Sequence, residues 1–390
     1  MRIGLLKEVG NTRCVALTPQ DVAWLVAQKF QVYVQTGAGD TLHFSDIDYT
    51  HAGATLFKTN KQIIDTSDII VGLHLKYSLQ RSIKYLKPHH YVLGLLNPLH
   101  DDKFYKKLNK SKVTAFSPEL IPRITRAQSM DVLSSIATLA GYQAVISAAD
   151  LSTNILPMMM TAAGTLTPSK VLVMGAGVAG LQACATAKRL GAVVEAYDIR
   201  AATREQIISV GARPIILDID NDSSEPQDHE NQSDYAKEQS QDFVSQQQKA
   251  LTEVLASKDI IITTASIPGK PAPKLITKSM LKKMKEDAIV IDLAAASGGN
   301  TDVTKVGETI EYGSVTIMGL DDVTAFKPMH SSQMLSSNLK HFIALLGVKK
   351  TASPDFTDDI IRETCICHKG KIISAQLQTQ SSKKKEKETA

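Results

Sequence analysis

Three glycines at fixed spacing carry the most specific chemistry in the sequence. Gly175, Gly177 and Gly180 give the pattern G-x-G-x-x-G between an apolar run, 170–175, and a helical stretch that continues to about Leu190. In such a turn the first glycine permits a tight bend, the second lets a pyrophosphate approach the backbone, and the third lets helix and strand pack closely. The pattern predicts a dinucleotide site; the alternative is that the glycines serve only a tight turn.

A carboxylate follows this motif at the distance that a dinucleotide site requires. Asp198 lies 18 residues after Gly180, at the end of the next predicted strand, 193–198. There it can accept hydrogen bonds from both ribose hydroxyls of NAD, and its charge would repel the 2′-phosphate of NADP. Arg200 is of the type that accommodates such a phosphate, but the carboxylate in the ribose position favours NAD.

Other residues at these turns are candidate nucleotide contacts, because they lie at the carboxyl ends of predicted parallel strands, where open α/β sheets bind ligands. These candidates are Ala176, Val178 and Ala179 within the motif, Ile199 beside Asp198, and Thr264 and Ala265 at the end of the predicted strand 260–264. The SIPGKPAP segment, 266–273, is either part of the same site or a plain proline-rich turn.

A second polar cluster precedes a long predicted helix, from about residue 129 to 149. Arg123, Arg126, Gln128 and Asp131 could orient a carboxamide and a phosphate. The same stretch also suits a helix start, since Thr125-x-x-Gln128 fits a capping box and an acidic residue in the first turn favours the helix dipole. The residues alone leave both interpretations open.

The elements that must position these residues follow an α/β pattern. Short apolar runs alternate with amphipathic stretches along the whole chain, which predicts two Rossmann-like, doubly wound parallel-sheet domains flanking a nucleotide cleft. The first domain is predicted to comprise 1–125 and about 335–378, and the second 126–334. Within the second, the acidic and polar segment of about 218–242 predicts a mobile surface loop.

Composition limits the classes of protein to consider. A chain of 390 residues is longer than one core usually holds, which favours two domains. The net charge of +4 owes much to a lysine-rich tail, 379–390, which is predicted to be disordered. The rest is close to neutral, so no nucleic-acid partner is predicted. No apolar run approaches the roughly 20 residues that cross a bilayer, so no transmembrane segment or signal peptide is predicted. Four cysteines fit a reducing cytoplasm.

Metal and covalent chemistry find little support. Cys365-x-Cys367-His368 has the residue types of a metal site, but no second pair of ligands follows at a zinc-like spacing. Neither a Ser-His-Asp order nor an H-E-x-x-H motif is present. The sequence therefore predicts no metal site and no nucleophile.

Several stretches together resemble the NAD(H)-binding alpha subunit of proton-translocating NAD(P) transhydrogenase. They are RAQSMDVLSSIATLAGYQAV, PMMMTAAGT, VLVMGAGVAGLQACATAKRLGAVVEAYDIRAATREQ, YAKE and TTASIPGKPAP. The likeness covers about 3–373 and is most specific over 123–206. It implies that NADH on this chain passes a hydride to NADP+ on a separate subunit, in the Si-/Re-specific reaction that is coupled to proton movement across a membrane.

The resemblance also implies roles for particular residues. Arg123, Gln128, Asp131 and Ser134 match the residues that hold the nicotinamide and its ribose near the hydride acceptor. Tyr235 of YAKE matches a loop that closes over bound nucleotide. Hydride transfer needs orientation more than acid–base chemistry, which agrees with the missing nucleophile.

The partners and location follow from the same resemblance. It implies a homodimer that assembles with an NADP(H)-binding subunit and a membrane-embedded subunit. The chain would then be peripheral on the cytoplasmic, or matrix-like, face of the inner membrane, held there by its partners.

Departures from the family pattern keep two alternatives open. The loop reads Ser233-Asp234 before Tyr235, the segment 294–300 reads AAASGGN without the usual acidic residue, and 321–330 reads DDVTAFKPMH. One alternative is a non-catalytic NAD(H)-binding or sensing protein. The other is an alanine dehydrogenase, which is disfavoured because Cys14 aligns with the arginine that binds substrate in those enzymes.

Overall fold

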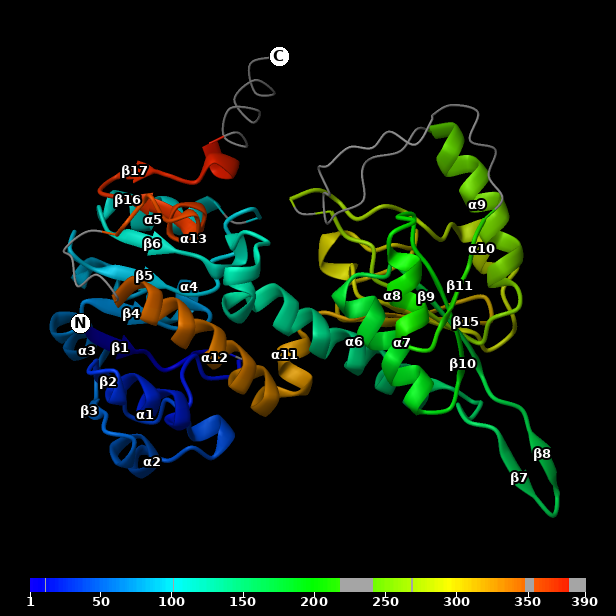
Figure 1. The fold of residues 1–390 in the computed structure, drawn as a ribbon, viewed down its shortest axis with the longest axis horizontal. Helices are drawn as coiled ribbons and strands as arrows, with labels where there is room; N and C mark the ends of the chain where they lie inside the picture. The colour runs from blue at the N-terminus through cyan, green and yellow to red at the C-terminus, as the bar shows by residue number, and fades with distance from the viewer. Residues whose placement is uncertain (11, 101, 218–240, 268, 348–353, 379–390) are drawn as a thin grey trace. The chain divides into compact units, whose positions relative to one another are not determined.

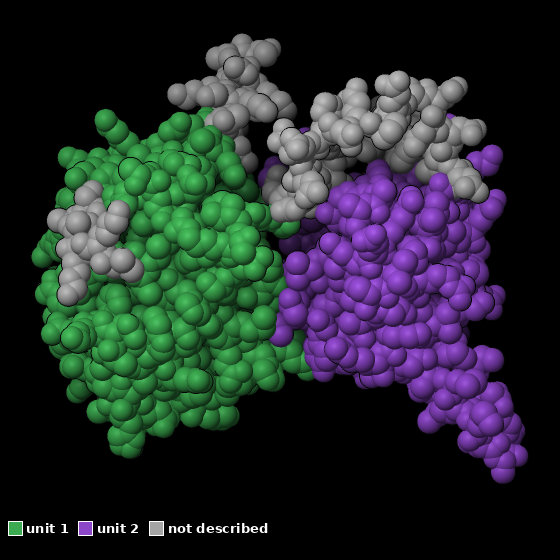
Figure 2. All heavy atoms as spheres, viewed as in Figure 1, with its two compact units in different colours: residues 1–136, 324–390 green, residues 137–323 purple. Residues whose placement is uncertain are grey.

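The structure is a computed structural model and describes residues 1–390 except 11, 101, 218–240, 268, 348–353 and 379–390. Contacts divide the chain into unit 1, residues 1–136 and 324–390, and unit 2, residues 137–323 (Figure 2). The domain limits proposed from the sequence stay predictions, because the units are defined by contacts alone. The predicted mobile loop lies outside the described residues except at its end, and so do Tyr235 and the lysine-rich tail.

Unit 1 is built on an eight-stranded sheet (Figure 1). Its strands are β1 (Arg2–Leu5), β2 (Gln31–Gln35), β3 (Thr55–Phe57), β4 (Ile69–Val71), β5 (Tyr91–Leu93), β6 (Thr114–Phe116), β16 (Cys365–His368) and β17 (Lys371–Ile372). The order is β17-β16-β6-β5-β4-β1-β2-β3, with β1 to β6 parallel and the last two strands antiparallel. The order β3-β2-β1-β4-β5-β6 is that of a doubly wound fold, so the winding reverses between β1 and β4.

Helices cover both faces of this sheet. They are α1 (Pro19–Ala27), α2 (Asp46–His51), α3 (Asn60–Thr66), α4 (Leu75–Ser78), α5 (Asp102–Lys110), α12 (Pro328–Gly347) and α13 (Asp359–Thr364), with short 3₁₀ turns at 40–42, 83–85, 118–120 and 125–130. Ile69 and Val71 of β4 pack in one core cluster with α1 and α12, whereas Ile70 packs in the other with α3 and α5. Alternate residues of a strand point to opposite faces, so both faces of the sheet are buried.

Unit 2 repeats the same winding on a seven-stranded sheet. Its strands are β9 (Lys170–Met174), β10 (Val193–Tyr197), β11 (Arg213–Pro214), β12 (Ile260–Thr263), β13 (Ile289–Asp292), β14 (Thr309–Tyr312) and β15 (Val315–Gly319). The order is β11-β10-β9-β12-β13-β15-β14, parallel except for β14. The winding reverses between β9 and β12. Two doubly wound parallel-sheet units are therefore present, as the sequence predicted.

The helices of unit 2 again form two layers. They are α7 (Val178–Arg189), α8 (Thr203–Ser209), α9 (Gln241–Leu255), α10 (Lys278–Leu281) and the short α11 (Val323–Phe326) at its end, with a 3₁₀ turn at 295–297. Val171 and Val173 of β9 pack with α7 and α8, and Leu172 and Met174 pack with α9 and α10. A separate two-stranded hairpin, β7 (Met159–Thr161) and β8 (Gly164–Leu166), belongs to neither sheet.

Helix α6 (Val132–Leu151) begins in unit 1 and ends in unit 2, and its start differs from the prediction. Residues 125–130 form a 3₁₀ turn that has no side-chain cap, so the capping box Thr125-x-x-Gln128 is wrong. The cap of α6 is Asp131, which accepts a hydrogen bond from the Ser134 N–H at 2.9 Å. A carboxylate there satisfies a backbone donor that the helix leaves unpaired.

The apolar length of α6 corrects another expectation. Among the described residues, α6 is long and apolar enough to cross a membrane, with a mean hydropathy of 1.4, although the sequence analysis identified no such run. Part of the helix packs in the core of unit 2 through Ala144, Val145 and Ala148. A core helix of an α/β unit passes the same test of length and composition.

A buried ion pair fastens α12 to α1 within unit 1. The Lys340 Nζ lies 2.5 Å from Asp21 Oδ1, and the Ser336 hydroxyl donates to Asp21 Oδ2 at 2.5 Å. The ammonium group also lies 5.3 Å from the centre of the Trp24 ring. Residues more than 300 positions apart are thus joined where both charged side chains are largely buried.

Removing one partner of this pair should be far more harmful than replacing both. We expect Asp21→Ala to lower the free energy of unfolding by about 3 kcal/mol, because it leaves the Lys340 ammonium buried without a counter-charge. The double variant Asp21→Leu/Lys340→Met should recover most of that loss. Urea unfolding followed by circular dichroism measures both. A single variant as stable as the wild type would contradict the role of the pair.

Candidate nucleotide site

The glycine motif forms the turn between β9 and α7, and two of its glycines are required by close approaches. Gly175 has a φ of +103°, and a Cβ atom there would lie 2.5 Å from Thr264 Oγ1. A Cβ at Gly180 would lie 1.8 Å from the Gly175 carbonyl oxygen. Both distances are too short for any side chain, so the turn and the helix–strand packing allow only glycine.

Gly177 differs from its two neighbours in the motif. Its φ is −79°, and among the described residues no atom lies within 4 Å of the position that a Cβ would take. Gly177 is the N-cap of α7, and no side chain caps this helix start. The space beside Gly177 and the uncapped N–H groups of α7, at Val178 and Ala179, fit a pyrophosphate.

Asp198 follows β10 and ties two neighbouring turns together. Its Oδ2 accepts the Ala176 N–H at 2.7 Å, and its Oδ1 accepts the Arg200 N–H at 2.9 Å. The Arg200 guanidinium also donates to both oxygens, each at 3.0 Å. Burial raises the pKa of Asp198, but the hydrogen bonds from Arg200 and Ala176 outweigh it and hold the pKa below its usual value. The carboxylate therefore stays ionised, ready to accept hydroxyl groups.

Thr264 and Ala265 lie at the end of β12, across the switch point from the glycine turn. The Thr264 hydroxyl donates to the Gly175 carbonyl at 3.0 Å. The Ala265 N–H donates to Asn300 Oδ1 at 3.1 Å, and Asn300 Nδ2 donates back to the Ala265 carbonyl at 2.8 Å. The structure therefore brings the predicted residues 175–180, 198–200, 264 and 265 to one edge of the unit 2 sheet.

Asn300 and Asp292 support this edge, and the sequence analysis did not assign them a role. Both are fully buried. Asp292 Oδ2 accepts the Asn300 N–H at 2.7 Å and the Thr304 hydroxyl at 2.6 Å, so it fixes the Gly-Gly-Asn turn from below. The acidic residue missing from 294–300 leaves this support intact. No local pattern marks Asp292, since it reads only as the last residue of a buried strand.

The second predicted cluster lies in unit 1 at the start of α6. Arg123 and Gln128 are exposed, and Asp131 and Ser134 are half-buried. The Ser134 hydroxyl donates to Asp131 Oδ2 at 2.6 Å, in addition to the capping bond from the Ser134 N–H. The structure thus joins Asp131 and Ser134 directly and presents Arg123 and Gln128 at the surface of the same short segment.

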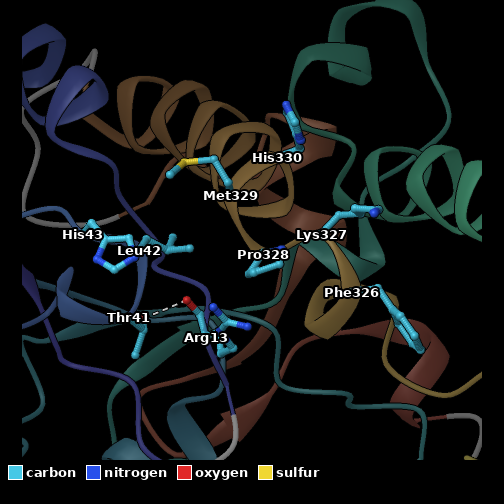
Figure 3. A pocket seen from close by; sticks show the side chains of 9 residues that line it. All are labelled: Arg13, Thr41, Leu42, His43, Phe326, Lys327, Pro328, Met329 and His330. Atoms are coloured by element: carbon cyan, nitrogen blue, oxygen red, sulfur yellow. Dashed lines mark hydrogen bonds between the residues drawn. The ribbon is translucent and has the colours of Figure 1, made fainter.

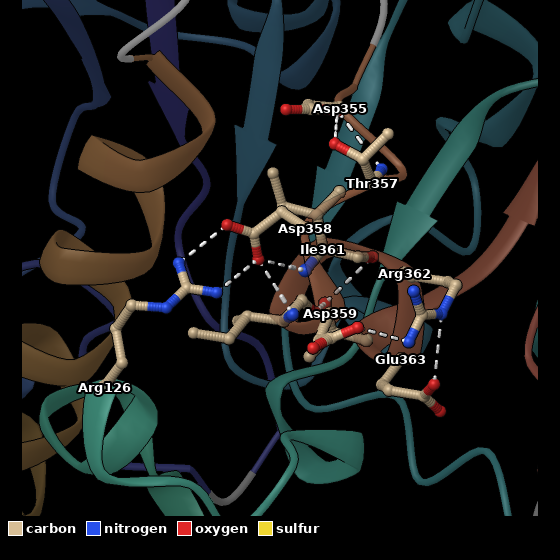
Figure 4. Close-up of polar contacts among 10 residues, drawn as sticks. Arg126, Asp355, Thr357, Asp358, Asp359, Ile361, Arg362 and Glu363 are labelled. Carbon is tan, nitrogen blue, oxygen red and sulfur yellow. Dashed lines mark hydrogen bonds and ion pairs between the residues drawn. The ribbon is translucent and has the colours of Figure 1, made fainter.

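Arg126, the remaining member of that cluster, is engaged elsewhere. Its guanidinium forms a two-pronged ion pair with Asp358, at 2.6 and 3.0 Å (Figure 4). Asp358 also caps α13 by accepting the N–H groups of Ile360 and Ile361. The pairing with Arg126 holds the pKa of Asp358 below its usual value. Arg126 therefore fastens the 3₁₀ turn at 125–130 to α13.

The switch point of unit 1 is filled by the protein itself. Glu8 follows β1, and its carboxylate accepts the backbone N–H groups of Leu73 at 2.5 Å and His74 at 3.1 Å, just after β4. The Glu8 side chain is buried, and burial raises its pKa. A carboxylate here occupies the place where the equivalent edge of unit 2 leaves room for a phosphate. Of the two described sheets, that of unit 2 therefore has the geometry of a dinucleotide site.

A hollow of about 290 Å³ lies in unit 1 between the first loop and the start of α12. It is lined by Arg13, Thr41, Leu42, His43 and residues 326–330 (Figure 3). Cys14, beside it, is buried, and its Sγ lies 3.6 Å from the carbonyl oxygens of Thr324 and Pro328. Two departures from the family pattern, Cys14 and the segment 321–330, therefore pack against each other.

The Cys365-x-Cys367-His368 stretch lies on β16. Both thiols are buried; burial raises the pKa of Cys365 and raises that of Cys367 to about 12. His368 instead shares a 2.8 Å hydrogen bond with Thr114. Among the described residues, no group of three or more His, Cys, Asp or Glu side chains is arranged to bind a metal ion.

The fold and this edge define a dinucleotide-binding protein of the doubly wound class. Residues 4–140 match the family model "Alanine dehydrogenase/PNT, N-terminal domain", and residues 144–375 match "Alanine dehydrogenase/PNT, C-terminal domain". The chain therefore belongs to the alanine dehydrogenase/PNT family, in which it is related to NAD(P) transhydrogenase alpha subunits. The resemblance found in the sequence is confirmed.

Individual relatives agree. The first portion of a split NAD(P) transhydrogenase alpha subunit of Rhodospirillum rubrum is 40% identical over 98% of this chain and 100% of its own length. A solved transhydrogenase from Sinorhizobium meliloti is 37% identical with a TM-score of 0.83, covering 96% of this chain and 100% of that one. An L-alanine dehydrogenase structure, at 21% identity and a TM-score of 0.79, covers 98% of this chain and 99% of its own and shares the fold. These likenesses support an NAD-binding oxidoreductase, a component of a transhydrogenase.

Two glycines of one motif should respond differently to the same substitution. Gly177→Ala should leave the melting temperature unchanged, because open space surrounds that position, but should weaken NADH binding at least about tenfold by entering the pyrophosphate space. Gly180→Ala should instead destabilise the fold, because its Cβ meets the Gly175 carbonyl. Thermal unfolding and NADH fluorescence titration separate the two effects. Equal behaviour of the variants would contradict this assignment.

Proposed function

We propose that this chain is the NAD(H)-binding component of a proton-translocating transhydrogenase, and that it exchanges a hydride between NADH and NADP+ bound on a partner subunit. The observation that carries the proposal is the open edge of unit 2, where the Gly177 space, the uncapped start of α7 and the ionised Asp198 lie together. The relatives named as transhydrogenase alpha subunits support the choice of reaction over other dinucleotide chemistry.

The residues of unit 2 would bind and orient the nucleotide. The N–H groups at the start of α7 would hold the pyrophosphate, and Asp198 would accept the adenine-side ribose hydroxyls. Arg200 already fills part of the Asp198 carboxylate, so ribose binding requires that ion pair to adjust. Ala176, Ile199, Thr264 and Ala265 would contact the nucleotide through backbone and small side chains. An ionised aspartate in this position favours NAD(H) over NADP(H).

The residues at the start of α6 would serve the nicotinamide end. The nicotinamide supplies or accepts the hydride when bound. Arg123 and Gln128 are exposed and available to hold its carboxamide and phosphate, and the Asp131–Ser134 pair is already fixed by two hydrogen bonds. None of these groups needs to transfer a proton, since the contribution required is the alignment of two rings. Tyr235 would close over the nucleotide, as its match to the family loop implies.

Cys14 argues against an amino-acid dehydrogenase. An arginine at this position would be needed to bind a substrate carboxylate, whereas the Cys14 thiol is buried and directed at two backbone carbonyls. A thiol offers no positive charge to a carboxylate. L-alanine with NAD+ is therefore expected to give no turnover.

Gln128 offers the sharpest test of the hydride-transfer role. Because its side chain is exposed, Gln128→Asn should leave stability and NADH affinity unchanged but abolish reduction of an NADP+ analogue. The assay combines the purified chain with a soluble NADP(H)-binding transhydrogenase component. Ser129→Ala, at the exposed neighbouring position, is the matched control and should keep full turnover.

The outcomes of this assay distinguish the enzyme from a non-catalytic NAD(H) sensor. Turnover by the wild type that requires both proteins and is lost in Gln128→Asn supports the proposal. Normal turnover in Gln128→Asn would remove that residue from the site. A wild type that binds NADH but never transfers hydride to the partner component would favour the sensor.

The β7–β8 hairpin supports a homodimer as part of the proposal. Its side chains are exposed on both strands, including Met158, Met160 and Leu166 at 59%, 76% and 53%. An isolated two-stranded hairpin is marginally stable in water, so apolar residues on it favour a protein partner. No residue from 152 to 169 is charged, and identical surfaces that meet in a symmetric dimer are therefore free of like-charge repulsion. NADP(H)-binding and membrane-embedded subunits would complete the assembly, placing the chain peripherally on the cytoplasmic or matrix-like face.

A charge in the hairpin should disrupt this dimer. We expect Met160→Asp to shift the chain from dimer to monomer, because a carboxylate buried in an apolar contact is costly without a partner. Light scattering coupled to size-exclusion chromatography measures the mass. Ile208→Asp changes an equally apolar side chain, 60% exposed on α8, and should leave the mass unaltered. A wild type that is monomeric, or a Met160→Asp variant that remains dimeric, would contradict the role of the hairpin.

A further inference from the structure

Two segments far apart in the sequence gather lysines on one surface of unit 1. The end of α5 and the stretch just after it contribute Lys107, Lys110 and Lys112, and the turn between β16 and β17 contributes Lys369 and Lys371. A Cβ placed at Gly370 would lie 3.6 Å from Lys112 Cγ, so the two segments are in contact. We call these five exposed residues the lysine face; α5, β16 and β17 lie together in Figure 1.

The charges of the lysine face are not neutralised within the described part of the chain. None of the five ammonium groups forms a hydrogen bond or ion pair with another described residue. The adjacent α13 is acidic, but its carboxylates are already paired. Asp358 pairs with Arg126, and Asp359 and Glu363 pair with Arg362 (Figure 4). The face therefore presents uncompensated positive charge.

Local structural needs do not explain all five lysines. Lys107 and Lys110 are in the last turn of α5, where positive charge complements the helix dipole. Lys112 and Lys369 instead have left-handed backbones, with φ of +58° and +49°. A residue with a Cβ is strained in that conformation, and glycine or asparagine would suit it better. Lysine is thus present at two positions that disfavour it conformationally.

We propose that the lysine face binds the anionic headgroups of a lipid bilayer. This inference rests on the proposed function, which places the chain beside a membrane through its partners. Compact ammonium groups on flexible stems suit a diffuse layer of negative charge, and each lysine near such a surface contributes about fivefold to binding. Specific nucleic-acid contacts instead favour arginine forks and stacked aromatic side chains, neither of which is part of this face.

Vesicle co-sedimentation of the full-length chain tests the proposal. The vesicles are phosphatidylcholine alone or phosphatidylcholine with a minority of phosphatidylglycerol, at low and at high salt. The test variant is Lys110→Glu/Lys369→Glu/Lys371→Glu. The control is Lys249→Glu/Lys282→Glu/Lys283→Glu, which makes the same charge change at exposed lysines of unit 2.

We expect the wild type and the control to bind only the phosphatidylglycerol vesicles and to be released by salt. The test variant should lose about 100-fold in partition coefficient, since three attractive charges are removed. Equal losses in test and control variants would show a net-charge effect and overturn the proposal. Unchanged binding of the test variant would do the same, including the case in which the lysine-rich tail alone binds lipid.

Two further measurements keep this proposal separate from the function of the chain. The test variant should retain the wild-type melting temperature and full hydride transfer with the soluble partner component, because the lysine face lies outside the proposed nucleotide contacts. A lipid result can therefore fail while hydride transfer succeeds, and the reverse. Preferential binding of short duplex DNA over anionic vesicles, lost in the test variant, would replace the lipid with a nucleic acid and overturn the proposal.

Discussion

The hydrogen bond from the Ala176 N–H to Asp198 Oδ2, 2.7 Å long, organises the candidate site. It joins the turn after β9 to the turn after β10, so the glycine motif and the ribose-binding carboxylate have fixed relative positions. Arg200 anchors the same carboxylate from the other side and keeps it ionised. A group that must discriminate between NAD and NADP is thereby held both charged and in place before any ligand arrives. Such rigidity suits a reaction whose main requirement is alignment.

The two doubly wound units show how one topology supports different roles. Each has its winding reversed next to the central strand, and each could in principle bind a ligand there. In unit 1 the Glu8 carboxylate occupies the backbone donors at this point, whereas in unit 2 the Gly177 position is open. The difference comes from one buried side chain against one missing side chain. Function therefore depends on the site and not on the fold.

The fold class, the glycine turn and Asp198 could be predicted from the amino-acid order, because they depend on residues within one short stretch and on backbone rules that hold in any protein. The start of α6 stayed undecided between a cap and a site, and the Thr125-x-x-Gln128 interpretation was wrong because Asp131 had the better geometry for the cap. The β7–β8 hairpin was missed, because its residues lack a regular alternation of buried and exposed positions.

Other features became visible only in the folded chain. They include which unit has room for a nucleotide, how Asn300 and Asp292 support Ala265, and why Cys14 packs against 324–328. Folding also gives a chain that is nearly neutral along most of its length a local lysine face. Most of these contacts join residues separated by tens to hundreds of positions. No local pattern encodes them, because they exist only once the strands have paired and the helices have packed.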